Sequence, residues 1–401
     1  MGSDADRALS MYVQDLITSG ALVPGLMERA FRAVPRHRFV DHWYRLEALG
    51  LQATWEYVLF DRDDPNARDL AEVYSNTSLV TKLSGCLPSA SSSEPVLVSR
   101  MLEILEIEPG MKVLEIGTGT GYNAALLAEL VGEPALVSTI EIQQDVAESA
   151  RGALDAEGYG AIRILHADGV GGFAEGAPFD RIEATVGCSD LSPHWLRQLA
   201  DGGRILLPLQ HGHLHPLLLI EPSSSDPVRA VGRWVDHASF MAIQGAMACV
   251  NPWQSFILGE LPRDGARRRP IPVPLPAMNE GKLPLTDPEH RAFHFFLSLS
   301  SRRLWSPLDG YGLADVGGRA IALVVGDEIE IRERPGETGC GDRLAEDLVD
   351  LLERWERLGR PNPDAYQIEF VPKVESPVLG TDSGNEWVIE RIHYWEIVRL
   401  P

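Results

Sequence analysis

The stretch VLEIGTGTGYNAALLAELVG, residues 113–132, decides the fold of this 401-residue chain. An apolar run with an acid as its third residue, Val113–Ile116, enters a glycine turn, and Ala124, Leu127 and Val131 then recur at helical spacing. This pattern predicts a strand, a tight loop and a helix. Such a unit binds a nucleotide-like ligand at the carboxyl end of a parallel strand.

The spacing of the glycines favours one class of ligand over another. Gly117, Gly119 and Gly121 form G-x-G-x-G, whereas a dinucleotide fingerprint would place its third glycine at position 122, which is Tyr122. The observed spacing suits S-adenosylmethionine (SAM), which has no pyrophosphate for the helix N-terminus to hold. Glycines let the backbone approach the amino acid part of that ligand. A nicotinamide-dependent dehydrogenase remains a remote alternative.

Two further positions fall where a SAM site needs them. Glu141 ends the next predicted strand, about 20 residues past the glycines, where an acid accepts hydrogen bonds from both ribose hydroxyls. Asp168 and Gly169 follow the predicted strand 162–166, where a carboxylate can bond the adenine amino group. Each position alone is also typical of a turn or a solvated acid. Their order and their placement at strand ends together indicate a cofactor site.

The pattern along the chain predicts an α/β fold with a smaller second domain. From Pro95 onward, strands alternate with helices, which indicates a Rossmann-like, doubly wound sheet. Residues 7–50 have a helical pattern, and residues 61–94 read as a long loop. We expect a catalytic domain, a proline-rich linker and an α+β C-terminal domain. Their predicted bounds are 1–260 (N-terminal helices 1–95, SAM-binding core 96–222, terminal strands 223–260), 261–288 and 289–401.

Composition limits the partners and the compartment. The formal net charge of -22 argues against binding nucleic acid through its phosphates. No apolar run approaches the length of a membrane span, and the four scattered cysteines form no C-x-x-C pair, so we expect a cytoplasmic protein. The histidines His211, His213 and His215 have no acid or cysteine nearby in sequence, so no metal site is predicted. Arg267–Arg269 reads as a solvated turn or as a contact for an acidic peptide.

A family resemblance appears once the N-terminal segment is added to the glycine loop. Residues 26–40, LMERAFRAVPRHRFV, resemble the opening signature of protein-L-isoaspartate (D-aspartate) O-methyltransferases, and GGRILLP at 202–208 matches the same family. The resemblance extends to about residue 220 and implies a class I SAM-dependent methyltransferase that releases S-adenosylhomocysteine. It implies these cofactor-binding residues: Glu115, Gly117, Thr118, Gly119, Gly121, Tyr122, Glu141, Asp168 and Gly169.

The substrate segment departs from the family pattern. In the family, a threonine-isoleucine-serine-alanine-proline-histidine segment precedes the first sheet helix, and its serine touches the substrate carboxylate. Alignment on Pro95 places that serine at Ser93, while Val96 and Val98 stand where the family has histidines. The resemblance implies substrate binding by Ser91, Ser92 and Ser93, with Ser93 positioning the carboxylate. The plain alternative for three serines is a flexible loop.

A second resemblance covers more of the chain. It is similar to actinobacterial relatives of the repair enzyme that tailor ribosomally made peptides such as lanthipeptides, lasso peptides and graspetides. Those relatives share the serine-rich motif and a C-terminal extension. They methylate one aspartate of a cyclised peptide, and the ester closes to a succinimide (aspartimide). This resemblance implies a peptide substrate. Repair of isoaspartyl proteins, and a SAM-binding or peptide-binding scaffold without catalysis, remain alternatives.

Overall fold

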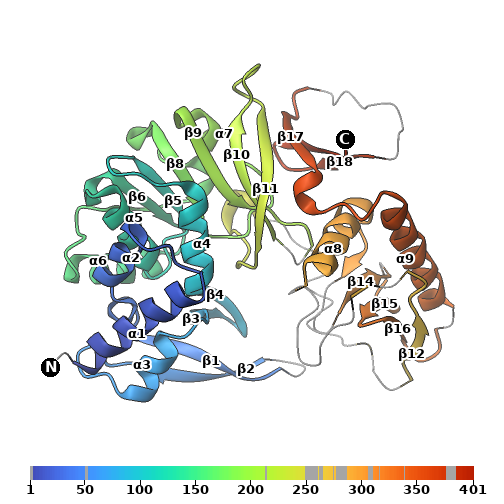
Figure 1. The fold of residues 1–401 in the computed structure, drawn as a ribbon, viewed down its shortest axis with the longest axis horizontal. Helices are drawn as coiled ribbons and strands as arrows, with labels where there is room; N and C mark the ends of the chain where they lie inside the picture. Colours follow the sequence, from blue (N-terminus) through green and yellow to red (C-terminus); the bar gives the residue numbers. More distant parts are fainter. Residues whose placement is uncertain are drawn as a thin grey trace. The chain divides into compact units, whose positions relative to one another are not determined.

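The computed structural model divides the chain into two compact units (Figure 1). Unit 1 comprises residues 1–208, 218–230 and 240–248, and unit 2 comprises residues 209–217, 231–239 and 249–401. The described residues are 3–49, 53–212, 215–248, 261, 265–273, 275–276, 287–305, 310–315, 317–337, 339–375 and 385–401.

A parallel sheet forms the centre of unit 1. Its strands lie in the order β9-β8-β5-β6-β7, and every neighbouring pair is parallel. The chain winds to one side from β5 and to the other side from β8, so the topological switch point lies between these two strands. The predicted class I fold is confirmed. The bounds are β5 (Val113–Ile116), β6 (Val137–Glu141), β7 (Arg163–His166), β8 (Phe179–Ala184) and β9 (Leu199–Pro208).

Helices cover this sheet where the sequence predicts them. Helix α5 packs on β6, α6 packs on β6 and β7, and α4 and α7 pack on β9. Helix α5 is buried along nearly its whole length because α2 covers its outer side. The bounds are α1 (Asp4–Thr18), α2 (Leu26–Ala33), α4 (Pro95–Leu105), α5 (Tyr122–Val131), α6 (Gln144–Ala156) and α7 (Pro193–Arg197).

A small antiparallel sheet replaces part of the predicted helical region and most of the predicted loop. It has the order β2-β1-β3-β4. The helical prediction is wrong from residue 42, because consecutive side chains there point to opposite faces of a strand. The Trp43 side chain is buried, and its indole donates to Glu72. Tyr44 lies opposite Tyr57 of the neighbouring strand. The elements are β1 (His42–Leu49), β2 (Ala53–Leu59), α3 (Ala67–Val73), β3 (Leu79–Ser84) and β4 (Leu87–Ser92).

Unit 2 contains the predicted α+β elements. Asp287 caps helix α8 by accepting from the amides of Glu289 and His290. The predicted hairpin around Gly326 is confirmed. One sheet has the order β12-β16-β15-β14-β13, and a second group pairs as β18-β19-β17. The elements are β12 (Arg267–Pro270), α8 (Pro288–Ser300), β13 (Leu304–Trp305), β14 (Tyr311–Ala314), β15 (Ala320–Val325), β16 (Glu328–Glu333), α9 (Cys340–Arg357), β17 (Gln367–Pro372), β18 (Glu386–Glu390) and β19 (Tyr394–Arg399).

The basic run Arg267–Arg269 is not a turn, and acids of the same unit already pair with two of its side chains. It forms strand β12, because its side chains face acids of unit 2: Arg267 pairs with Asp342, and Arg268 pairs with Glu330. Strand β11 (Ala230–Ala238) lies in the segment 223–260 predicted to hold terminal strands, whereas β10 (His215–Pro222) falls within the bounds predicted for the SAM-binding core. Residues 249–260 and half of the predicted linker 261–288 lie outside the described residues.

Candidate active site

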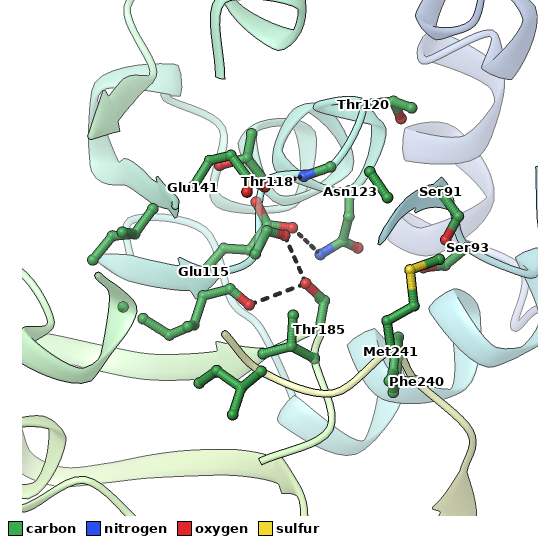
Figure 2. Close-up of a pocket in the computed structure, with 18 of the residues that line it drawn as sticks. Ser91, Ser93, Glu115, Thr118, Thr120, Asn123, Glu141, Thr185, Phe240 and Met241 are labelled. Atoms are coloured by element: carbon green, nitrogen blue, oxygen red, sulfur yellow. Dashed lines mark hydrogen bonds between the residues drawn. The ribbon is translucent and has the colours of Figure 1, made fainter. Parts of the chain in front are cut away.

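A pocket lies at the switch point, beside the carboxyl ends of β5 and β8 (Figure 2). Its wall is formed by β4, the glycine loop, the end of β6, the end of β8 and residues 240–244. Gly121 and Asp168 are not among its lining residues. The predicted site residues that line it are Ser91, Ser92, Ser93, Glu115, Gly117, Thr118, Gly119, Tyr122, Glu141 and Gly169.

The glycine loop passes close to its neighbours in two places. Gly117 has a φ of +102°, and a β-carbon there would lie 2.8 Å from the hydroxyl of Thr185. The amide of Gly119 donates to Oε2 of Glu141 at 3.2 Å, and Oε1 of Glu141 accepts from the amide of Gln143 at 3.0 Å. These bonds fix the Glu141 carboxylate at the pocket wall (Figure 2).

Tyr122 and Gly121 have packing roles. The Tyr122 side chain is buried, and its ring lies 6.5 Å from that of Phe31 and 5.8 Å from that of Phe39. A β-carbon on Gly121 would lie 3.2 Å from Leu154 of α6. The start of α5 is therefore packed between the N-terminal segment and α6. This packing fixes the end of the glycine loop, which leads directly into α5.

Asp168 holds a loop beside the pocket. Its Oδ1 accepts from the amide of Val170 at 3.0 Å, and its Oδ2 accepts from the amide of Ala246 at 2.7 Å. The neighbouring Gly169 lines the pocket, and its carbonyl accepts from the indole of Trp195 at 2.8 Å. The Asp168 carboxylate thus fixes residues 245–247, while Gly169 presents backbone to the pocket.

The three serines are ordered by the buried side chain of Arg36. The guanidinium donates to the Ser92 hydroxyl at 3.3 Å and to the carbonyls of Ser92 and Ser93 at 3.1 and 3.0 Å. The Ser91 and Ser93 hydroxyls are bonded to no other residue of the described ranges, and Figure 2 shows both across the pocket from Glu141. The alternative of a flexible loop is not what the structure has: Ser91 and Ser92 end strand β4, and Ser93 follows it.

Arg36 also binds the neighbouring segment. Its Nη1 donates to the carbonyl of Val73 at 2.7 Å, and its Nη2 donates to that of Thr77 at 2.9 Å. Burial lowers the pKa of this guanidinium, and no carboxylate bonds it within the described part of the chain. Arg36 belongs to the family signature in the sequence. Its bonds to the segment Ser91–Ser93, which we call the serine strand, are apparent only from the structure.

The rim next to the serines is apolar. Val98 and Met101 of α4 line the pocket. The amide of Val96 is bonded to Oδ1 of Asn76 at 3.0 Å, which ties the start of α4 to residue 76. The two positions aligned with family histidines therefore carry no acid-base group.

The floor of the pocket contains two buried acids. Nδ2 of Asn123 donates to Oε1 of Glu115 at 2.8 Å and to Oε2 of Glu183 at 2.9 Å, and the hydroxyl of Thr139 donates to Oε2 of Glu115 at 2.6 Å. Burial raises the pKa of Glu115 to about 8 and that of Glu183 to about 7. Sequence reasoning missed Glu183 and Asn123, because the strand Phe179–Ala184 carries other charged residues and nothing in its pattern marks Glu183 as buried.

Sequence reasoning also missed residues 240–244, which line the pocket. The amide of Gly187 donates to the carbonyl of Met241 at 2.8 Å, and the amide of Ile243 returns a bond to the carbonyl of Gly187 at 2.9 Å. Nothing in the local sequence marks this segment, because its position depends on a contact with residues after β8.

The histidine group predicted to bind no metal is partly described. His211 is buried in unit 2, with its ring nitrogens bonded to Ser298 and Glu396 at 3.2 and 3.0 Å. His213 lies outside the described residues. In the ranges that the structure describes, no cluster of three potential metal ligands occurs, and no helix is long and apolar enough to cross a membrane.

The doubly wound sheet and the glycine-loop pocket at its switch point define a class I SAM-dependent methyltransferase. Comparison with known proteins then identifies the family. Residues 61–242 match the family described as Protein-L-isoaspartate(D-aspartate) O-methyltransferase (PCMT). The chain belongs to this family. It is a SAM-dependent carboxyl methyltransferase, and the dehydrogenase alternative is excluded.

Two relatives illustrate the coverage. The chain is 33% identical over 219 residues to a protein-L-isoaspartate O-methyltransferase of Methanothermobacter thermautotrophicus, which covers 54% of this chain and 87% of the relative. The corresponding protein of Methanopyrus kandleri is 39% identical over 224 residues, covering 56% of this chain and 86% of the relative.

One solved structure extends the likeness in fold. It is titled as a protein-L-isoaspartate O-methyltransferase and aligns with a TM-score of 0.52 at 23% identity. The alignment covers 90% of this chain and 96% of the solved chain, so it includes residues of both units.

Proposed function

We propose that this methyltransferase acts in the cytoplasm on an aspartyl side chain of a modified ribosomal peptide. The ester product closes to a succinimide, which can hydrolyse to isoaspartate. The observation that carries the proposal is the serine strand: Ser91 and Ser93 offer hydroxyls at the pocket, and the adjoining Val98 is apolar. Cys86, Cys188 and Cys340 are free, which agrees with a reducing compartment.

The site residues suit the cofactor of the family. Gly117 and Gly119 line the pocket and let the loop pass so close to Thr185 and Ser91 that a β-carbon, which would lie 2.9 Å or closer to them, would not fit, and in this proposal their backbone faces the methionine part. In this proposal Glu141 accepts hydrogen bonds from the ribose hydroxyls and Gly169 contacts the adenine, and both residues line the pocket. When bound, SAM supplies a methyl group already activated by its sulfonium.

The chemistry requires little from the protein beyond alignment. An aspartyl carboxylate is ionised at neutral pH, so its oxygen can attack the methyl carbon without a general base, and the thioether product leaves. The Ser93 hydroxyl would orient that oxygen by donating a hydrogen bond. The amide nitrogen of the next residue then attacks the ester carbonyl, methanol leaves and the succinimide ring forms.

Repair of isoaspartyl residues in proteins is the second candidate. The names of the relatives favour it, and a solved chain with that name aligns across both units. An added C-terminal region therefore does not by itself separate tailoring from repair. In the tailoring proposal, the predicted domain 289–401 contacts the peptide.

A substrate panel separates these functions. Purified enzyme and SAM would be incubated with an isoaspartyl hexapeptide, its aspartyl counterpart and an aspartyl peptide closed by side-chain ester or amide bonds. Methylation of the cyclised peptide, followed by loss of methanol in the mass spectrum, supports the proposal. Efficient turnover of the isoaspartyl hexapeptide alone contradicts it and favours repair. SAM binding by calorimetry without methylation of any peptide indicates a scaffold.

Substitution of the serine tests its role. Ser93→Ala should lower turnover about tenfold or more, because one hydrogen bond to a charged group is lost. The affinity for S-adenosylhomocysteine should change less than about twofold, since Ser93 belongs to the acceptor side. Ser10→Ala on α1 is the control for a serine outside the pocket. A large loss of cofactor affinity in Ser93→Ala would assign this residue to the cofactor instead.

A further inference from the structure

Two carboxylates lie side by side on adjacent strands below the glycine loop. Glu115 of β5 and Glu183 of β8 are register partners in the parallel pairing, and both are almost fully buried. Both line the pocket together with Asn123, whose amide nitrogen bridges them. Figure 2 shows the bond from Asn123 to Glu115.

These two acids have no counter-charge in the described protein. Besides burial, only neutral donors and other acids influence them: Asn123 and Thr139 lower the pKa of Glu115, whereas Glu183 and Glu141 raise it. For Glu183 the only opposing influence is Asn123. Two buried carboxylates without a cation are costly, and a cationic ligand removes much of that cost.

The hydrogen bonds distinguish the two acids. Both oxygens of Glu115 already accept, one from Asn123 and one from Thr139. Glu183 accepts from Asn123 through Oε2, while its Oε1 receives no bond from another described residue. Glu183 is therefore the acid with an oxygen left for a ligand.

We propose that Glu183 receives the ammonium group of the methionine part of SAM, with Glu115 and Asn123 completing a negatively charged site. The glycine loop is fixed directly above, because the hydroxyl of Thr185 donates to the carbonyl of Gly117 at 2.6 Å. Thr185 follows Glu183 by two residues at the carboxyl end of β8. The acid therefore lies close to Gly117, in the loop that we assign to the amino acid portion of SAM. An ammonium offers three donors to such acceptors.

Two ligands that differ in the amino acid part test this assignment. S-adenosylhomocysteine carries the ammonium, whereas 5′-methylthioadenosine has the same adenosine and thioether without it. Calorimetry would compare both ligands on the wild type, on Glu183→Gln and on Glu106→Gln. Glu106 carries an exposed carboxylate in unit 1 and is the matched control.

Glu183→Gln should weaken S-adenosylhomocysteine about tenfold or more and leave 5′-methylthioadenosine within about twofold, because a charged hydrogen bond is lost from one ligand only. Wild-type binding of S-adenosylhomocysteine at pH 7 should release protons, as measured in buffers of different ionisation enthalpy, and binding of 5′-methylthioadenosine should not. An unchanged affinity for S-adenosylhomocysteine, or equal losses for both ligands, overturns the proposal. Neither result depends on a peptide, so the outcome is separate from that of the proposed acceptor.

Discussion

The backbone of Gly119 lies directly against Ser91, so that a β-carbon on Gly119 would stand 2.9 Å from the Ser91 carbonyl oxygen. In the proposed function, Gly119 belongs to the loop on the cofactor side of the pocket, and Ser91 belongs to the strand on the acceptor side. The cofactor and acceptor sides of the pocket are therefore in backbone contact, and a small displacement of one must move the other.

Gly119→Ala should disturb both sides at once. The added methyl group meets a backbone oxygen, and the φ of +54° adds about 1 kcal/mol of strain. We expect the affinity for S-adenosylhomocysteine to fall about tenfold or more if the loop shifts by the needed distance. Calorimetry measures the affinity, and urea denaturation measures the stability.

Gly132→Ala is the matched control. Gly132 has a φ of +78° at the end of α5, and a β-carbon there would have no neighbour within 4 Å. It should lose a similar stability of about 1 kcal/mol while keeping the affinity for S-adenosylhomocysteine. Equal affinities in the two variants would show that the contact between Gly119 and Ser91 is not limiting.

Arg36→Lys should loosen the serine strand. An ammonium cannot reach the separate carbonyls that the planar guanidinium bonds, among them those of Val73, Thr77 and Ser93. Orphaned buried carbonyls should cost about 3 kcal/mol of unfolding free energy. We expect kcat/KM for the peptide to fall more than the affinity for S-adenosylhomocysteine.

Arg38→Lys provides the comparison for Arg36. Its guanidinium pairs with Glu157 and Asp63 and is partly exposed, so the same substitution should cost less than about 1 kcal/mol. Similar losses of stability and of kcat/KM in the two variants would contradict a special role for Arg36.

Sequence patterns predicted the elements whose hydrogen bonds and packing are local in the chain. The glycine loop, Glu141 and the alternation after Pro95 identified the fold and the cofactor side, because each depends on a strand end and the helix that follows. The strand β4 was missed, since serines have no strand preference and this strand is held by pairing with β3 and by the distant Arg36. Glu183 was missed for a related reason: its partner Glu115 is a neighbour in the sheet, not in the chain.

The buried acids should make the stability of the free enzyme fall as pH rises. The pKa of Glu183 is raised from 4.5 to about 7, and that of Glu115 to about 8. The folded state holds protons that the unfolded state has released, so their stabilisation is complete below pH 4.5 and is lost as pH rises through 7 to 8. For Glu183 the effect is on the order of 3 kcal/mol at about 1.4 kcal/mol for each pKa unit.

Glu183→Gln isolates this effect. Between pH 5 and pH 9, the unfolding free energy of the variant should rise relative to that of the wild type. Urea denaturation at fixed ionic strength measures both values. Groups other than Glu115 titrate alike in both proteins and cancel in the difference, while Glu115, whose pKa Glu183 raises, moves the difference in the same direction. A difference that does not change with pH would show that Glu183 remains ionised throughout this range.

The buried ion pair in unit 2 should stabilise that unit without serving the cofactor. Although burial alone would raise the pKa of Glu396, Arg391 and His211 hold it at about 2, so the carboxylate is charged and paired. Glu396→Gln removes the buried carboxylate that neutralises Arg391 and should cost about 3–5 kcal/mol. Glu390→Gln on β18 breaks the exposed pair with Lys373 and should lower the unfolding free energy far less than Glu396→Gln does. Calorimetry should show unchanged affinity for S-adenosylhomocysteine in both variants, because the cofactor pocket is built entirely from unit 1 residues. A loss of affinity in Glu396→Gln alone would show that unit 2 must be folded for the cofactor to bind.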